Sequence, residues 1–290
     1  MSVATDVTTG DAAPTGTPTT RRGTAGALLR RAAPGVLGVL GIVAVWWLAA
    51  VTVLAGTTTP TPAGVVRGFA ADGLDFYVTH LSITLEEAVR GFLVGNGLAL
   101  ALASLVLLVP ALERLIMQVA VISYCLPLVA ITPILYIVIG PPPAGEPSGT
   151  AVVLAALSVF FTTVVGAVLG FRSADPATLD VVTVLGGGRW QQLIRVRLVA
   201  ALPSIIGALQ IAAPAALLGA ILGEYIGGVD RGVGPALVNA GQSLNGERAW
   251  GIALVCGLVA GAGYGLFALL ARVVTPWAAG GTRGADGGAS

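Results

Sequence analysis

The residues that most often carry catalysis or metal binding are scarce in this chain. His80 is the only histidine, and the two cysteines, Cys125 and Cys256, lie apart from each other in apolar runs. A catalytic triad or a zinc site needs several such groups together, and the sequence does not provide them. All 15 basic residues are arginines, so no phosphate-binding loop with its essential lysine can form. The sequence therefore predicts no enzyme, no metal site and no bound cofactor.

One segment, residues 172–197, is better suited to transmitting movement than to chemistry. Asp175 is a good cap for a helix N-terminus, and Pro176 suits the first helical position. Gly186 suits the position just after a helix, where a left-handed backbone is needed. The pattern predicts a short helix that ends at Gly186 and a second helix that begins near Arg189. Such a helix can dock into a groove on a peripheral protein, or it can be an ordinary amphipathic helix resting at the membrane interface.

Several residues inside or beside apolar runs could line or gate a pathway. Three prolines interrupt backbone hydrogen bonding there, either as kinks beside a water-filled cavity or as simple bends against a neighbouring helix. Glu224 follows an apolar run, where it could act in gating or be a solvated carboxylate at the interface. The pathway or gating candidates are Tyr124, Pro127, Thr132, Pro133, Pro214 and Glu224.

The elements that must position these residues are membrane helices. Of the 290 residues, 56% are hydrophobic and only 10% are charged, whereas soluble domains carry about 25% charged residues. A helix of about 20 apolar residues crosses the hydrocarbon core of a bilayer. The net charge of +1 gives no field that would recruit nucleic acid. The sequence predicts an all-α polytopic bundle of about six transmembrane helices, at residues 36–55, 91–109, 115–139, 151–170, 198–222 and 251–271.

The arginines predict the orientation of these spans. Placing the N-terminus in the cytoplasm puts most arginines on the cytoplasmic side, as the positive-inside rule requires. Both termini are then cytoplasmic, and a long loop, residues 224–250, lies outside. We expect residues 1–33 to be a disordered cytoplasmic tail, residues 34–277 to be the membrane domain and residues 278–290 to be flexible.

The stretch 180–203 resembles the EAA signature of ABC importer permeases. That signature contains a Glu-Ala-Ala triplet, a glycine four residues after it and an Ile-x-Leu-Pro ending. In this chain Asp replaces the Glu and two Val replace the two Ala. The matching positions are Asp180, Val181 and Val182 for the triplet, Gly186 for the glycine and Leu198 for the leucine, with Pro203 in the typical Ala-Ala-Leu-Pro that follows.

Other parts of the chain are similar to permeases of the nitrate, sulfonate, taurine and bicarbonate group. Together with the signature, they cover roughly residues 80–275 in the order found in that group. The similar stretches begin at His80-Leu-Ser-Ile-Thr-Leu, Ile131-Thr-Pro-Ile and Leu222-Gly-Glu-Tyr.

The resemblance implies a set of partners. The signature helix of these permeases docks on a cytoplasmic ATP-binding subunit, two permease subunits associate as a homodimer or heterodimer in the membrane lipid, and an external solute-binding protein delivers a small solute. The coupling residues that it implies are Asp180, Val181, Val182, Gly186, Arg189, Leu198 and Pro203. Because Gly186 alone matches the signature glycine, a substitution at Gly187 is expected to be milder than one at Gly186.

A stand-alone secondary transporter or channel is the alternative. It would need acidic or basic residues embedded in the spans for ion coupling, and the six apolar runs contain almost none.

Overall fold

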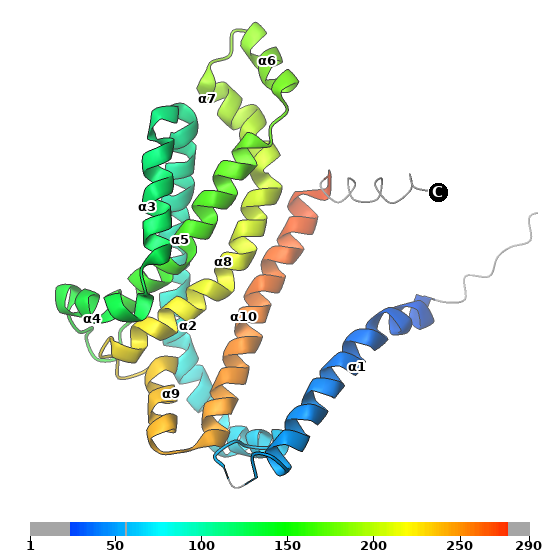
Figure 1. The fold of residues 1–290 in the computed structure, drawn as a ribbon, viewed down its shortest axis with the longest axis vertical. Helices are drawn as coiled ribbons and strands as arrows, with labels where there is room; N and C mark the ends of the chain where they lie inside the picture. Colours follow the sequence, from blue (N-terminus) through cyan, green and yellow to red (C-terminus); the bar gives the residue numbers. More distant parts are fainter. Residues whose placement is uncertain (1–23, 56, 278–290) are drawn as a thin grey trace, which may run out of the picture. The chain divides into compact units, whose positions relative to one another are not determined.

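The computed structural model describes residues 24–55 and 57–277, and every regular element in these two ranges is a helix (Figure 1). The all-α class predicted from the sequence is confirmed. Most of the predicted N-terminal tail, residues 1–23, and the predicted C-terminal tail, residues 278–290, lie outside the described residues.

The helices follow one another along the chain with short connections. Two brief elements, a 3₁₀ turn at Pro110–Leu112 and a π-helical turn at Leu193–Arg197, lie between them. The helices are α1 (Thr24–Val51), α2 (Pro62–Leu108), α3 (Glu113–Cys125), α4 (Leu128–Ile139), α5 (Gly149–Arg172), α6 (Pro176–Val184), α7 (Arg189–Gln192), α8 (Leu198–Ile226), α9 (Val233–Gln242) and α10 (Gly246–Val274).

Helix α1 belongs to a unit of its own, residues 1–55, while the other helices form a second unit from residue 56 onward. The helix begins at Thr24, which is inside the predicted tail and well before the predicted first span at residue 36. Pro34 lies within it, and Pro34–Val51 is long and apolar enough to cross a membrane.

Five helical stretches of the described chain are long and apolar enough to be membrane spans. A sixth span results if the bent pair α3 and α4 is counted as one broken span. This agrees with the predicted polytopic bundle of about six spans. The five stretches are Pro34–Val51, Pro62–Leu108, Gly149–Arg172, Arg189–Ile226 and Gly246–Val274.

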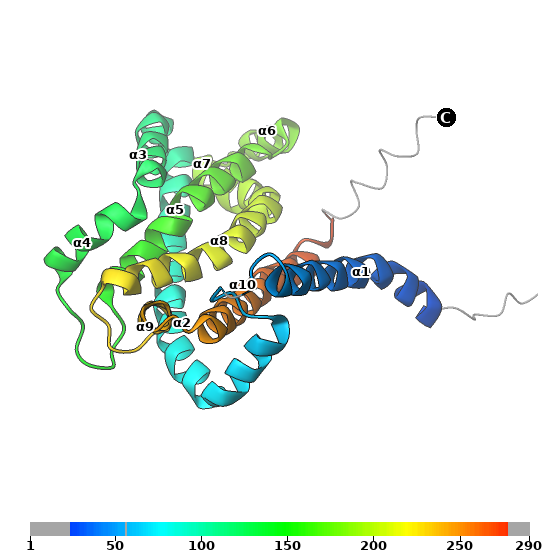
Figure 2. The ribbon, with the colours of Figure 1, turned by 60° about the horizontal axis from the view of Figure 1, so that its bottom comes forward.

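The predicted third span, residues 115–139, is not one straight helix. Helix α3 ends at Cys125, and α4 starts at Leu128 at an angle of 98° to it (Figure 2). Leu126 adopts an extended conformation (φ −69°, ψ 123°), which is the conformation that a following proline favours. Pro127 therefore forms an elbow.

Helix α2 is much longer than the predicted span at residues 91–109. It contains 47 residues and a sharp kink at Gly73, whose φ of +76° is left-handed. With a ψ of 160°, Gly73 lies in a region that essentially only glycine adopts, and an L-residue with a side chain would pay about 1–3 kcal/mol for it.

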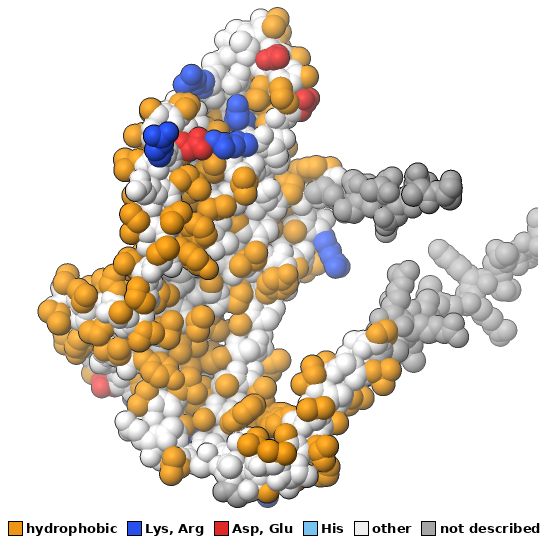
Figure 3. All heavy atoms as spheres, in the orientation of Figure 1, with side chains coloured by type: hydrophobic (Ala, Val, Ile, Leu, Met, Phe, Trp, Pro, Cys, Tyr) orange, Lys and Arg blue, Asp and Glu red, His pale blue; other side chains and the backbone are white. Residues whose placement is uncertain are grey.

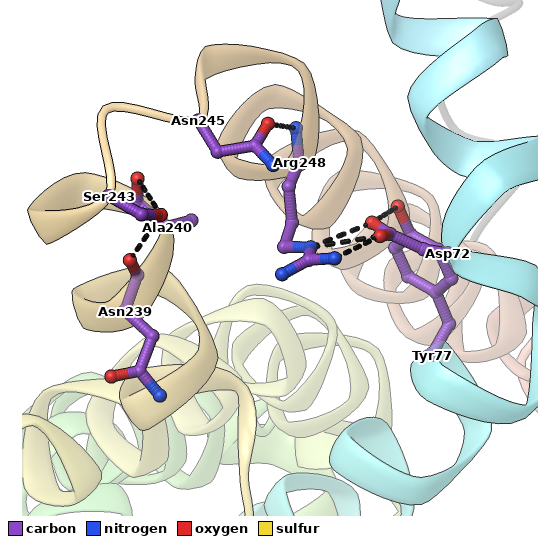
Figure 4. A network of polar contacts seen from close by, with 7 residues as sticks. All are labelled: Asp72, Tyr77, Asn239, Ala240, Ser243, Asn245 and Arg248. Carbon is purple, nitrogen blue, oxygen red and sulfur yellow. Dashed lines mark hydrogen bonds and ion pairs between the residues drawn. The ribbon is translucent and has the colours of Figure 1, made fainter.

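An ion pair beside this kink joins α2 to the start of α10 (Figure 4). The Nε of Arg248 donates to both carboxylate oxygens of Asp72, at 2.9 and 3.0 Å, and Nη2 also donates to Asp72. The side-chain oxygen of Asn245 caps α10 by accepting a hydrogen bond from the backbone N–H of Arg248 at 3.0 Å. The kinked part of α2 is thus fastened to the first turn of α10.

Helix α5 is the centre of the bundle, with α2 and α8 packed closely against it. A Cβ at Gly95 of α2 would lie 2.5 Å from the carbonyl oxygen of Ala156. On the other side, a Cβ at Gly219 of α8 would lie 2.7 Å from the carbonyl oxygen of Leu154. Small residues that let helix backbones approach in this way are typical of membrane helix interfaces.

The predicted outer loop, residues 224–250, contains the ten-residue helix α9. The cap residue Gly232 offers no side chain to cap this helix. Instead, the backbone N–H of Val233 donates to Thr84 at 2.9 Å, and that of Gly234 donates to Glu224 at 2.5 Å. Because its N-terminal N–H groups bond to α2 and α8 rather than to a local cap, the sequence around α9 carries no start signal.

Candidate coupling segment and pathway

The N-terminus of α6 is capped as its sequence predicts. Asp175 has the extended conformation of an N-cap, and its carboxylate accepts hydrogen bonds from the backbone N–H of Ala177 at 3.2 Å and from the Thr178 hydroxyl at 3.1 Å. Pro176 occupies the first helical position, where no backbone N–H is needed.

The C-terminus of α6 is a Schellman motif. The N–H of Gly187 donates to the carbonyl of Val182 at 2.8 Å, and the N–H of Gly186 donates to that of Thr183 at 2.9 Å. Gly186 has a φ of +80°, as predicted, and its Cβ position faces open space. The glycine is therefore required by the backbone conformation and not by a close neighbour.

Helix α6 presents apolar side chains to its surroundings. Val181 is 58% exposed, Val184 is 86% exposed and Leu185, just after the helix, is 81% exposed. Asp180 is exposed beside them. On the face drawn in Figure 3, charged side chains gather around α3, α6 and α7, and hydrophobic side chains cover much of the helices below.

Polar contacts tie α6 to α7. The amide group of Gln192 donates to the Thr183 hydroxyl at 2.8 Å and lies 3.4 Å from the Leu179 carbonyl oxygen. These bonds hold the short helix against the start of the next one.

Arginines then tie this segment to the ends of the spans. Arg189 donates to the carbonyl of Leu108 at the end of α2 (3.3 Å), and Arg197 donates to that of Phe171 near the end of α5 (3.1 Å). Arg172 also pairs with Glu113 of α3. Arginines at helix C-termini donate hydrogen bonds to carbonyl groups that have no partner within the helix, and their positive charge interacts favourably with the negative end of the helix dipole.

The structure divides the seven predicted coupling residues into two groups. Five of them lie on α6, in its C-terminal turn or at the start of α7: Asp180, Val181, Val182, Gly186 and Arg189. The other two belong to α8, where Leu198 is the first residue and Pro203 lies within the helix, half-buried. These two are part of the spanning helix and not of the exposed tip.

The elbow brings four of the six pathway candidates together. Tyr124 is 68% exposed and its ring stacks on that of Phe161, 4.7 Å away. Pro127 forms the turn and Pro133 is exposed on α4. Thr132, however, is fully buried and donates its hydroxyl to the Leu128 carbonyl at 2.7 Å. Its side chain therefore satisfies the backbone of α4.

The other two candidates lie on α8, away from the elbow. Pro214 is half-buried inside the helix. Glu224 is only 2% exposed, so the alternative of a solvated interfacial carboxylate is wrong. Thr84 donates to one of its oxygens at 2.5 Å and Gly234 donates to the other.

Sequence analysis missed the residues that surround Glu224. Glu87 and Thr84 are both fully buried. The charged residues Glu86, Glu87 and Arg90 predict a stretch at the membrane interface, but only Glu86 and Arg90 are exposed, where they form an ion pair. The available signal was spacing, since Thr84, Glu87, Gly91 and Gly95 recur every three to four residues along the buried face of α2.

Helix α6 is exposed, is capped at both ends and lies in the chain between the spanning helices α5 and α8. A short helix placed in this way between membrane spans is typical of the membrane components of transporters. The chain belongs to the family of binding-protein-dependent transport system inner membrane components, which it matches over residues 94–279. It is thus an ABC importer permease, as the signature resemblance predicted.

Curated relatives carry matching names. The chain is 30% identical over 161 residues to a "probable ABC transporter permease protein" of Haemophilus influenzae, covering 56% of this chain and 63% of that relative, which is less than two thirds of its length. It is 30% identical to the riboflavin transport system permease protein RibX of Chloroflexus aurantiacus, covering 83% of this chain and 88% of RibX. It is 27% identical to SsuC of Bacillus subtilis, a permease protein named for aliphatic sulfonates, covering 81% and 84%.

Proposed function

We propose that this chain forms the translocation pathway of an ATP-driven importer and couples to a cytoplasmic ATPase through residues 172–197. The observation that supports this most strongly is the construction of α6. The helix is fixed at both ends by Asp175 and Gly186, yet Val181, Val184 and Leu185 are left exposed. Exposed apolar side chains on a rigid helix suit the groove of a partner protein.

The contacts behind α6 provide a route for movement into the membrane. A displacement of α6 would pull on α7 through Gln192, on the end of α2 through Arg189 and on the end of α5 through Arg197. Helices α2 and α5 pack with their backbones in close contact. A close-packed interface of this kind deforms little, so a shift of one helix moves the other with it.

Membership of the family supports the remaining parts of the proposed importer. ATP is hydrolysed by the partner subunit, a second permease subunit completes the pathway, and an external binding protein delivers a small solute. In this proposal the chain is a protein of the inner membrane with both termini in the cytoplasm. The pathway candidates Tyr124, Pro127 and Pro133 lie on the elbow between α3 and α4.

The docking proposal is tested by making the tip of α6 polar. The double variant Val184→Ser/Leu185→Ser alters two side chains that are more than 80% exposed, so folding should be preserved. We expect loss of ATPase co-purification and of ATP-driven solute uptake.

Leu244→Ser is the matched control, because Leu244 is 73% exposed in the turn between α9 and α10. It should keep the ATPase bound. Full ATPase binding by the α6 double variant would show that this helix is an ordinary interfacial helix and would refute the proposal.

A further inference from the structure

Two glutamates are buried together at the end of the bundle away from α6. Glu87 of α2 is fully buried and Glu224 of α8 is 2% exposed. Thr84, which lies about one turn before Glu87 on the same buried face of α2, donates to Glu224 at 2.5 Å, so the two glutamates are neighbours in the bundle. Glu87 precedes the end of α2 at Leu108 by about six turns, or roughly 30 Å. The carboxyl pair, Glu87 with Glu224, therefore lies about one hydrocarbon-core thickness along α2 from the end of that helix that Arg189 contacts.

Each carboxyl group of the pair receives hydrogen bonds from a different helix N-terminus. Glu224 accepts from the N–H of Gly234 in the first turn of α9 and from the Thr84 hydroxyl, both at 2.5 Å. Glu87 accepts through Oε1 from the N–H of Ser148, the cap of α5, at 2.5 Å. The pair therefore joins α2, α5, α8 and α9.

The second oxygen of Glu87 has no donor. Oε2 is fully buried and has no hydrogen-bonding partner among the described residues. An ionised carboxylate can only accept hydrogen bonds, so the neighbouring Glu224, if ionised, cannot supply the donor that Oε2 lacks. A buried acceptor without a donor is strongly unfavourable.

No cation among the described residues forms an ion pair with either acidic group. Glu86 is paired with Arg90 on the exposed side of α2. The other titratable or charged groups nearby are His80, whose Nδ1 lies 2.9 Å from the Gly232 carbonyl oxygen, Arg231 just before α9, Cys256 on α10 and Tyr136 of α4 beside Gly228.

A metal ion would be a poor substitute for the missing cation. A metal ion needs several ligands, and within the described ranges no three His, Cys, Asp or Glu side chains come together to hold one. A proton needs only one oxygen to bind covalently and a second oxygen to accept the resulting hydrogen bond. Two adjacent carboxylates in a low-dielectric site cannot both be ionised, and one proton between them turns an acceptor into the donor that Oε2 lacks.

We propose that Glu87 and Glu224 form a binding site for one proton, which they share inside the membrane domain. The shared proton supplies the hydrogen bond between α2 and α8 and leaves one negative charge. The N-termini of α5 and α9 stabilise that charge. The site is distinct from the coupling segment and does not depend on the identity of the transported solute.

Infrared spectroscopy of the full chain in lipid nanodiscs tests the proposal, because the C=O stretch of a protonated carboxyl group is separate from that of a carboxylate and shifts in D₂O. At neutral pH we expect this band in the wild-type chain. In Glu87→Gln the band should disappear, since the Gln amide can donate to Glu224 in place of the proton. Glu86→Gln is the matched control and should keep the band, because Glu86 is exposed and paired with Arg90.

Three results would each overturn the shared-proton site. The first is absence of the band from the wild-type chain. The second is its persistence in Glu87→Gln with loss only in Glu87→Gln/Glu224→Gln, which would mean that Glu224 alone holds the proton. The third is its persistence in the double variant, which would place the proton elsewhere. No ATPase, binding protein or solute is needed, so failure here leaves the proposed function untouched.

Discussion

The two ends of the bundle deal with polar groups in opposite ways. Around α6, polar groups are satisfied locally or by arginines, and apolar side chains such as Val184 are left exposed. Around the carboxyl pair, Glu87, Glu224 and Thr84 are buried and accept hydrogen bonds from backbone N–H groups of other helices.

The two ends therefore contribute differently to stability: one set of contacts holds a single segment in shape, and the other holds separate helices together. The coupling segment is held together by contacts between neighbours in sequence, so it can keep its shape while a partner moves it. The carboxyl pair holds together helices that are far apart in sequence, so a disturbance there loosens the bundle itself. Substitutions at the buried end should therefore reduce stability, and those at the exposed end should reduce assembly with partners.

The largest effect is expected from Thr84→Val at the buried end. The hydroxyl donates to Glu224 and accepts from the N–H of Val233, so its removal leaves two buried groups without a partner. Each should lower the free energy of unfolding by roughly 1–3 kcal/mol. Thermal unfolding in detergent measures the loss. Thr84→Ser retains the hydroxyl and should be close to wild type, and equal stability of the two variants would contradict the role assigned to this bond.

Gly187→Ala should have the next largest effect. A Cβ at this position would lie 2.5 Å from Cγ1 and 2.7 Å from the carbonyl oxygen of Val182. Overpacking of this kind costs roughly 1–3 kcal/mol. The expectation from the signature, that Gly187 is the more tolerant position, is therefore reversed: we expect Gly187→Ala to reduce ATPase co-purification at least as much as Gly186→Val does. A variant indistinguishable from wild type would restore the original expectation.

Gly186→Val should cost about 1–2 kcal/mol in backbone strain, because φ is +80° while the space around Cβ is open. The spans should still insert, so expression should be near normal while ATPase co-purification and uptake fall. Gly188→Ala is the matched control, since Gly188 has a φ of −83° and no neighbour within 4 Å of its Cβ position. Equal uptake by both variants would mean that the end of α6 does not need this conformation.

The smallest effect is expected from Arg90→Gln. Arg90 and Glu86 form an exposed pair four residues apart on α2, and such pairs contribute about 0.3–0.5 kcal/mol. Thermal unfolding should barely change. Arg248→Gln provides the contrast, because its partner Asp72 has a side chain that is only 6% exposed. A larger loss for Arg90→Gln than for Arg248→Gln would contradict this assignment of exposed and buried pairs.

The two ends of α6 could be predicted because their signals are local. Asp175, Pro176 and Gly186 each satisfy or release backbone groups within a few residues, so their types and spacing define both ends of α6. Pro127 likewise indicated a break in the third apolar run, although its angle of 98° depends on tertiary packing.

The carboxyl pair could not be predicted, because it depends on contacts between distant residues. Glu87 and Glu224 are brought together by the close packing of α2 and α8 on α5, and α9 is capped by those same helices. Glu87 also stands beside Glu86 in the sequence, and only the helical phase distinguishes the exposed carboxylate from the buried one.

The elbow at Pro127 shortens the third apolar run. Helix α3 has 13 residues and is therefore about 20 Å long, shorter than the hydrocarbon thickness of about 30 Å. Helix α4 then turns by 98° and presents Ile137 and Val138, 81% and 76% exposed, to its surroundings. The third apolar run is thus a broken span or a re-entrant loop and not one straight crossing. Such a break is tolerated at membrane depth where protein or a water-filled cavity surrounds it in place of lipid, and the proposed pathway would provide those surroundings.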